Sequence, residues 1–207
     1  MKKIIAMAVA AVCLVSATFA LDLEFGGRAI FGRNLGAGSF QENYTAAKED
    51  KTFDFGGGAY ANFALFGGLG VQAEANYVKS SIKFAGAGRE ETKYDIHTLD
   101  LAPMLWLNLD LWKFTLGFGA GPNFSIPVMS VSDATKAKKE DFTVGLIAGT
   151  DFKFYCTKHL GIVLSGRFVT EWDKKNINVY GVDTGIPEYT FNRKTLYGGL
   201  GLEWKII

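Results

Sequence analysis

Hydrophobic and polar residues alternate with a period of two along most of the chain, the pattern of strands with one apolar face. In the first such segment Leu23, Phe25 and Phe31 share one face, while Glu24 and Arg28 share the other. Eight segments repeat this design, over residues 21–31, 53–66, 69–84, 98–107, 114–124, 142–154, 160–172 and 196–206. Each has roughly ten to fourteen residues, whereas strands of globular proteins have about five or six and a bilayer crossing needs about nine to eleven. The pattern predicts eight strands long enough to span a membrane.

The connections between these segments alternate in length. Short turns are predicted at Gly67-Gly68, at Asn108 to Leu111 and at Tyr155 to Lys158. Long, charged loops are predicted at residues 32–52, 85–93, 127–141 and 173–193. Short turns at one end and long loops at the other are typical of outer-membrane barrels, with the turns periplasmic and the loops extracellular.

We therefore predict an all-β fold, an eight-stranded antiparallel up-and-down transmembrane β-barrel. A soluble secreted barrel such as a lipocalin is the alternative, because alternation does not say which face points inward. Three observations favour the membrane: the polar face is small and glycine-rich, lysines are rare on the apolar face, and aromatic residues lie near strand ends. The predicted aromatic girdle consists of Phe31, Phe55, Trp112, Phe124, Phe154, Trp172 and Trp204. Trp106 falls on the other face by parity.

The start of the chain has the features of a secretory signal peptide. Lys2 and Lys3 precede an apolar run from Ile4 to Val15, and Thr18 and Ala20 suit a cleavage site. We expect residues 1–20 to be a cleaved Sec signal peptide and residues 21–207 to be one barrel domain. Cys13 as a lipoprotein acceptor is the less favoured alternative, because the apolar run continues beyond it.

Composition excludes several classes of function. The formal net charge is +1 and becomes −1 without the two signal lysines, so no basic face suggests a nucleic-acid partner. The mature chain has Cys156 as its single cysteine, which excludes an internal disulfide. His97 and His159 lack metal-ligand spacing, so we expect no metal and no cofactor.

Four charged residues lie on the polar face, well inside their strands: Arg28, Glu74, Asp100 and Arg167. Counting residues from the nearest turn places all four in the middle band of the membrane, where an isolated charge would be costly. We predict that they form one charge-balanced network in the barrel interior. A structural plug is favoured over an ion path, because an eight-stranded barrel has room for side chains but little continuous water.

Stretches at residues 99–105, 117–124 and 145–154, and the last strand from Tyr197 to Trp204, resemble the small bacterial outer-membrane β-barrel proteins of the porin-like OmpX and OmpA type. The resemblance implies a place in the outer membrane, contact with its lipid and insertion by a BAM-type machinery. It does not imply one activity.

The first functional hypothesis is a non-enzymatic surface protein that displays its loops for envelope integrity, adhesion or contact with a host or surface ligand. We expect it to be a monomer. The second is a narrow channel for small or hydrophobic solutes, of the OmpW kind. The third is a lipid-modifying enzyme, for which His97 near the predicted rim lacks a serine nucleophile. No catalytic residue is therefore assigned.

Overall fold

A computed structural model describes residues 22–36, 38–40, 48–51, 53–66, 68–86, 89–132, 142–172, 175–178, 188–191 and 193–206. The predicted signal peptide lies outside the described residues, so its cleavage stays a prediction. Within the described part, no helix is long and apolar enough to cross a membrane.

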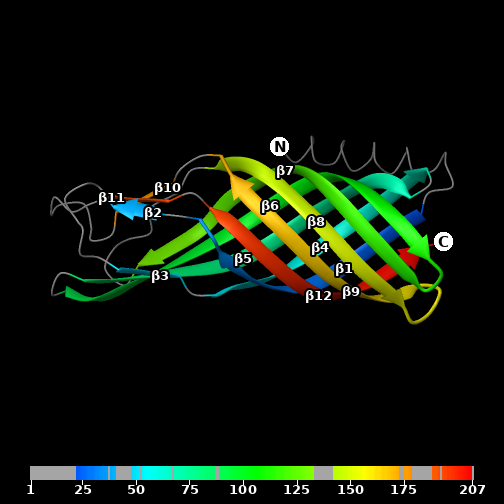
Figure 1. The fold of residues 1–207 in the computed structure, drawn as a ribbon, viewed down its shortest axis with the longest axis horizontal. Helices are drawn as coiled ribbons and strands as arrows, with labels where there is room; N and C mark the ends of the chain where they lie inside the picture. Colours follow the sequence, from blue (N-terminus) through cyan, green and yellow to red (C-terminus); the bar gives the residue numbers. More distant parts are fainter. Residues whose placement is uncertain are drawn as a thin grey trace.

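Eight long strands close into an antiparallel barrel, which confirms the predicted fold class (Figure 1). They are β1 (Asp22–Asn34), β4 (Phe53–Phe66), β5 (Leu69–Gly86), β6 (Arg89–Leu111), β7 (Phe114–Ser132), β8 (Thr143–Tyr155), β9 (Leu160–Glu171) and β12 (Lys194–Ile206). Strands that follow one another along the chain pair with each other, and β1 pairs with β12 to close the ring.

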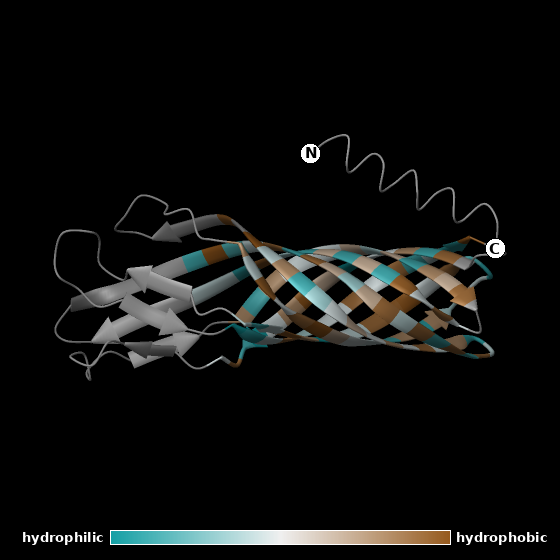
Figure 2. Ribbon diagram, turned by 90° about the horizontal axis from the view of Figure 1, so that it is seen from above, coloured by the Kyte–Doolittle hydropathy of each residue, from teal (hydrophilic) through white to brown (hydrophobic). Residues whose placement is uncertain are grey.

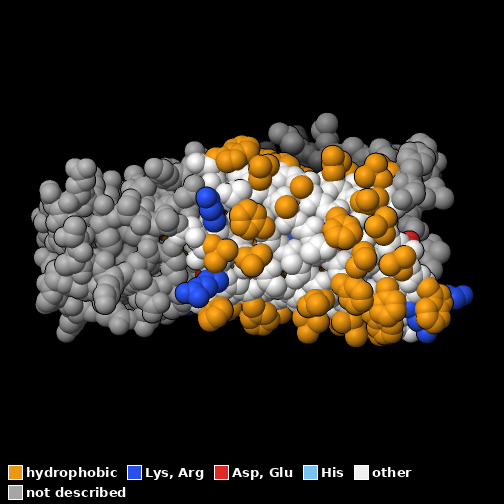
Figure 3. All heavy atoms as spheres, viewed as in Figure 1, with side chains coloured by type: hydrophobic (Ala, Val, Ile, Leu, Met, Phe, Trp, Pro, Cys, Tyr) orange, Lys and Arg blue, Asp and Glu red, His pale blue; other side chains and the backbone are white. Residues whose placement is uncertain are grey.

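The two faces of the barrel wall differ in chemistry, and this decides what lies inside. Brown and teal residues alternate along the strands in Figure 2, as a period of two requires. Leu164 is 58% exposed on the outside, whereas Trp106 is 1% exposed inside. The exterior seen in Figure 3 is largely hydrophobic, with lysine and arginine side chains at its two ends. The apolar face therefore points outward and the polar face forms the core.

Four short strands and the ends of three long ones extend the molecule at one end, which we call the loop end (Figure 1). The short strands are β2 (Gly38–Phe40), β3 (Lys48–Lys51), β10 (Lys175–Asn178) and β11 (Glu188–Phe191). β3 pairs with β5, while β10, β11 and β2 form a separate three-stranded sheet.

The predicted long loops are therefore partly wrong. β5 and β6 stay paired up to Gly86 and Arg89, and β7 continues to Ser132. Backbone pairing between these strands continues beyond the segments whose alternation predicted the membrane crossing. The predicted loops at residues 85–93 and 127–141 thus contain strand in their described parts.

The opposite end, which we call the turn end, carries the short turns and both ends of the described barrel chain. One predicted turn is wrong: Asn108 to Leu111 lies inside β6, and the reversal is at Trp112 and Lys113. Trp112 takes a φ of 60°, a conformation that glycine or asparagine usually supplies. The sequence has neither residue at position 112, whereas Asn108 and Asp110, which favour turns, stand just before it.

The seam between β6 and β7 has an interruption in the middle of the wall. Their register pairs Leu101 with Phe124 and Leu105 with Ala120, but the three positions between are not paired. The same register puts Pro103 opposite Pro122, and neither proline has a backbone N–H to donate. This part of the wall therefore lacks the ladder hydrogen bonds that hold the other seams.

Candidate functional site

Three of the four predicted interior charges meet in the middle of the barrel. The Arg167 guanidinium lies 2.6 Å from Glu74 Oε1 and 2.7 Å from Asp151 Oδ1. Arg28 donates to the other oxygen of Glu74. Because all four side chains are buried, these two cations and two anions form a formally neutral group, which we call the central cluster.

Glycines and a tryptophan make room for Arg167. A Cβ atom at Gly149 would come within 2.5 Å of Arg167 Cδ, so the side chain lies across a position that has none. On its other side the guanidinium carbon lies 4.9 Å from the centroid of the Trp106 ring, a cation–π distance. A Cβ atom at Gly117 would in turn lie 2.7 Å from Trp106 Nε1. The glycines of the inner face thus leave room for two large interior side chains, those of Arg167 and Trp106.

Asp100, the fourth predicted residue, lies in a different group of contacts nearer the loop end. Its two oxygens accept from Arg193 at 2.7 and 2.9 Å, a bidentate pair. Arg193 also lies 3.0 Å from Glu171 and 3.0 Å from Ser125 Oγ. We call these residues the loop-end cluster. Sequence reasoning missed Arg193 because it fell in a predicted long loop, whereas it directly precedes β12 and is buried in the barrel.

A third group lies toward the turn end. Lys153 Nζ is 2.5 Å from Glu24 and 2.8 Å from Glu203, and none of the three is more than 4% exposed. The Tyr155 hydroxyl bridges the same two carboxylates, at 3.0 Å and 2.5 Å. We call it the turn-end cluster. Sequence reasoning passed over Lys153 because it stands between Phe152 and Phe154, although its parity matches that of Asp151.

Carboxylates outnumber cations among the buried charged residues, seven to four. The carboxylates are Glu24, Asp54, Glu74, Asp100, Asp151, Glu171 and Glu203, and the cations are Arg28, Lys153, Arg167 and Arg193. The interior of the described barrel is therefore formally negative.

Neither histidine lies among these interior clusters. His97 Nδ1 is 2.5 Å from the Tyr77 hydroxyl, and nearby Asp95 pairs with Lys79 at 2.7 Å. His159 stacks on Trp204 with a centroid distance of 5.6 Å. Over the described residues, no group of His, Cys, Asp and Glu is arranged to hold a metal ion.

No family model matches the chain, and no curated protein matches it. Solved structures do match. The outer-membrane protein OprG of Pseudomonas aeruginosa is 14% identical, with a TM-score of 0.71 over 91% of this chain and 97% of that one. Neisserial surface protein A is 11% identical, with a TM-score of 0.54 over 89% and 97% of the two chains. The Escherichia coli outer membrane protein W is 12% identical, with a TM-score of 0.50 over 88% and 97%.

The chain has the fold of a small bacterial outer-membrane β-barrel. A barrel of this kind fits the cell outer membrane, with short turns in the periplasm and longer connections outside. The turn end is then periplasmic and the loop end extracellular.

The residues predicted to form the aromatic girdle of this outer-membrane barrel all lie on its outer surface or at its turn end. Phe31, Phe55, Phe124 and Trp172 lie toward the extracellular end of their strands, and Trp112, Phe154 and Trp204 lie toward the periplasmic end. Their exposure ranges from half-buried at Phe124 and Phe154 to 89% at Trp112. A role of these rings in the membrane interface stays a prediction.

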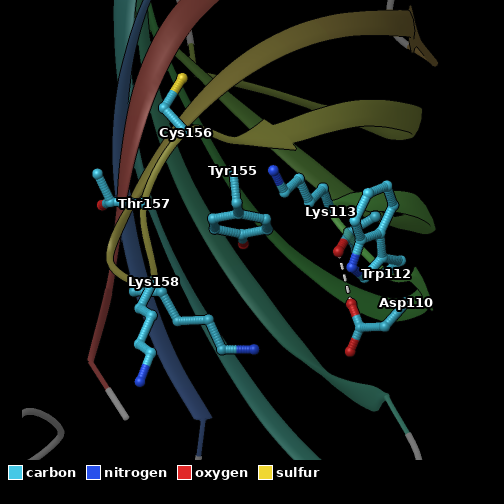
Figure 4. A pocket seen from close by; sticks show the side chains of 9 residues that line it. Asp110, Trp112, Lys113, Tyr155, Cys156, Thr157 and Lys158 are labelled. Carbon is cyan, nitrogen blue, oxygen red and sulfur yellow. Dashed lines mark hydrogen bonds between the residues drawn. The ribbon is translucent and has the colours of Figure 1, made fainter.

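The periplasmic mouth of the outer-membrane barrel holds a pocket of about 480 Å³ (Figure 4). It is lined by Asp110, Trp112, Lys113, Thr115, Tyr155, Cys156, Thr157, Lys158 and Lys205. Tyr155 belongs to the turn-end cluster, so the pocket lies directly below the packed interior.

Proposed function

We propose that the protein is a non-enzymatic integral outer-membrane protein, whose barrel is a closed anchor for an extracellular β-structured region. The region would serve envelope integrity, adhesion or contact with a host or surface ligand. The observation that carries this proposal is the filled interior of the barrel.

The three clusters fill the barrel at successive levels. The turn-end cluster joins β1, β8 and β12, the central cluster joins β1, β5, β8 and β9, and the loop-end cluster joins β6, β7, β9 and the start of β12. Each cluster bridges strands on different sides of the ring. An eight-stranded barrel is just wide enough for its side chains, so such bridges leave little space for a continuous column of water.

The strands at the loop end support a display role. β5, β6 and β7 have 18, 23 and 19 residues. A crossing needs about nine to eleven, so roughly eight or more residues of each strand are in excess, or about 25 Å of strand. This length of paired strand is a rigid support for a surface that contacts a partner outside the cell.

The proposal also states that the protein has no enzymatic activity, and it names the partners. The buried ion pairs lie where substrates of the outer leaflet do not reach, and His97 is engaged with Tyr77. We propose that a BAM-type machinery inserts the chain. We also propose a monomer, because a closed barrel leaves no strand edge with which a second subunit could pair.

Conductance in planar bilayers tests whether the barrel interior is filled. The mature chain is expected to insert without ohmic steps, because charged side chains fill its interior. Arg167→Ala, which removes the cation shared by Glu74 and Asp151, is expected to produce a measurable leak. Steady single-channel steps from the wild-type chain would instead support the alternative, a narrow channel for small or hydrophobic solutes.

Cell fractionation tests the placement. The mature chain should be recovered with the outer membrane, starting at Leu21, and a protease added to intact cells should cleave within residues 36–52 or 173–192. Recovery as a soluble periplasmic protein would overturn the proposal in favour of a lipocalin-like barrel.

A further inference from the structure

The pocket at the periplasmic mouth has chemistry that the proposed anchor role does not use. We propose that it is a binding site for a small soluble multivalent anion that carries phosphate or carboxylate groups. The proposal is independent of what the extracellular region contacts, since it concerns the opposite end of the barrel.

Three lysines from three different segments line the pocket, which gives it a positive charge. Lys113 lies in the turn between β6 and β7, Lys158 in the turn between β8 and β9, and Lys205 near the end of β12. The single carboxylate in the lining, Asp110, accepts a hydrogen bond from Thr115 Oγ1 at 2.5 Å. Lysines from several segments around one concavity suit an anion with more than one acidic group.

The pocket is also held in shape. Thr157 Oγ1 accepts hydrogen bonds from the backbone N–H groups of His159 and Leu160, at 3.2 and 2.9 Å, and so fixes the turn that carries Lys158. The Tyr155 hydroxyl bonds inward to Glu24 and Glu203, which leaves its ring as part of the lining. Figure 4 shows Lys113 between this ring and Trp112. Because the turn and the ring are fixed, ordering on ligand binding is confined to the lysine side chains.

The interior above the pocket explains why an anion would stop there. Glu24 and Glu203 lie immediately behind Tyr155, and carboxylates exceed cations among the buried groups of the described barrel. An anion is therefore attracted to the mouth and repelled by what lies beyond it. This charge order fits binding at the mouth and not passage through the barrel.

A soluble anion fits the pocket better than a lipid headgroup. Asp110, Thr115, Tyr155 and Lys205 belong to the inward-facing set of positions on their strands, so these four of the nine lining residues lie on the lumen side of the barrel wall. Phosphate chemistry is common to soluble anions and to phospholipids of the inner leaflet. The experiment must therefore separate the two sources.

Calorimetric titration of the mature chain in a non-ionic detergent, with pyrophosphate as the probe, tests the site. Saturable millimolar or tighter binding is expected, weakened by salt and weakened about fivefold by each of Lys113→Gln and Lys158→Gln. Lys194→Gln is the matched control, because Lys194 is an exposed lysine at the other end of the barrel. No binding, or equal losses in all three variants, would overturn the proposal.

A second arm separates the lipid source. The mature chain is reconstituted in phosphatidylcholine vesicles with and without phosphatidylglycerol, and pyrophosphate is added from the pocket side while Trp112 fluorescence is followed against Trp112→Phe. A response to pyrophosphate in phosphatidylcholine alone supports the soluble-anion site. A response only to phosphatidylglycerol would overturn it and identify a lipid contact. Neither outcome affects the conductance test of the anchor role.

Discussion

Most single charged residues in the barrel interior are stable as charges because a close partner of opposite sign lies beside them. Arg167 shows this most clearly, since it bonds Glu74 through two nitrogens and Asp151 through two more contacts. Removing one member of a buried ion pair leaves the other uncompensated, which commonly costs about 3–5 kcal/mol. Removal of one interior charge is therefore expected to destabilise the barrel more than removal of an exposed charge does.

Arg167→Ala should lower the free energy of unfolding in detergent by about 3–5 kcal/mol, because Glu74 and Asp151 lose their shared cation. Arg167→Lys should recover part of the loss, since an ammonium keeps the charge but not the forked geometry. Lys194→Ala is the control and should cost less than about 1 kcal/mol at its exposed position. The measurement is urea unfolding followed by gel mobility and fluorescence. Equal effects of Arg167→Ala and Lys194→Ala would argue against an interior held by ion pairs.

At this scale the sequence predicted part of the candidate site. Parity and depth brought Arg28, Glu74 and Arg167 to one place, as they lie in the structure. Parity alone could not pair Asp100 with Arg193, because that contact depends on where a long connection returns to the barrel. Lys153 was within reach of the same reasoning, since it alternates with Asp151 along β8.

At the scale of elements, the β6–β7 seam is the weak line of the barrel wall. Pro103 and Pro122 lie opposite each other in its register, and three consecutive positions of each strand are unpaired. Gly121 adds to the close approach, because a Cβ atom there would lie 2.8 Å from Met104 Cα. In lipid the carbonyl groups of this stretch have no water to compensate for the missing donors.

Pro122→Ala should strengthen this seam, because it supplies a backbone N–H that faces the neighbouring strand. The expected result is slower amide exchange at Leu101, Leu105, Ala120 and Phe124, which flank the interruption, measured by NMR in detergent micelles. The β8–β9 seam, continuous from Gly145 to Tyr155, is the internal control and should not change. Unchanged exchange at the four flanking amides would show that the prolines do not weaken the wall.

The sequence predicted the membrane-spanning strands well and their outer limits poorly. Alternation sorted the residues of every barrel strand into two faces, because a shift of one residue would exchange them. The glycine-rich polar face and the aromatic residues near strand ends then indicated which face points outward. It could not show that β5, β6 and β7 continue beyond the membrane, since pairing there does not need an apolar face. The turn at Trp112 was predicted too early in the chain, because Asn108 and Asp110 favour turns whereas Trp112 does not.

At the scale of the whole molecule, the barrel has the chemistry of a globular protein reversed. Large apolar residues such as Leu105, 70% exposed, and Leu164, 58% exposed, cover the outside, and ion pairs fill the inside. A hydrophobic surface of this extent is stable only when lipid covers it. The fold and its exterior thus support the same placement as the likeness to outer-membrane barrels.

Leu164→Arg should impair insertion by about 2–4 kcal/mol, because it puts a charge on the lipid face near the middle of β9. Leu35→Arg is the matched control, since Leu35 is also 58% exposed but lies past the extracellular end of β1, where the expected cost is about 0–1 kcal/mol. Folding into vesicles of defined thickness, followed by heat-modifiable gel mobility, measures both. If the two variants fold equally well, the lipid-facing assignment of Leu164 is wrong.

The most direct test of the outer-membrane barrel is the accessibility of spin labels along β9 to two paramagnetic relaxation agents. In a Cys156→Ser background, which removes the single mature cysteine, labels are placed one at a time from Ile162 to Val169 and the protein is reconstituted in lipid. Labels at 162, 164, 166 and 168 are expected to collide with oxygen and to be shielded from a water-soluble nickel chelate, while labels at 163, 165, 167 and 169 are expected to be shielded from both. Collision of the outward labels with the nickel chelate would contradict a lipid-facing exterior and with it the outer-membrane barrel.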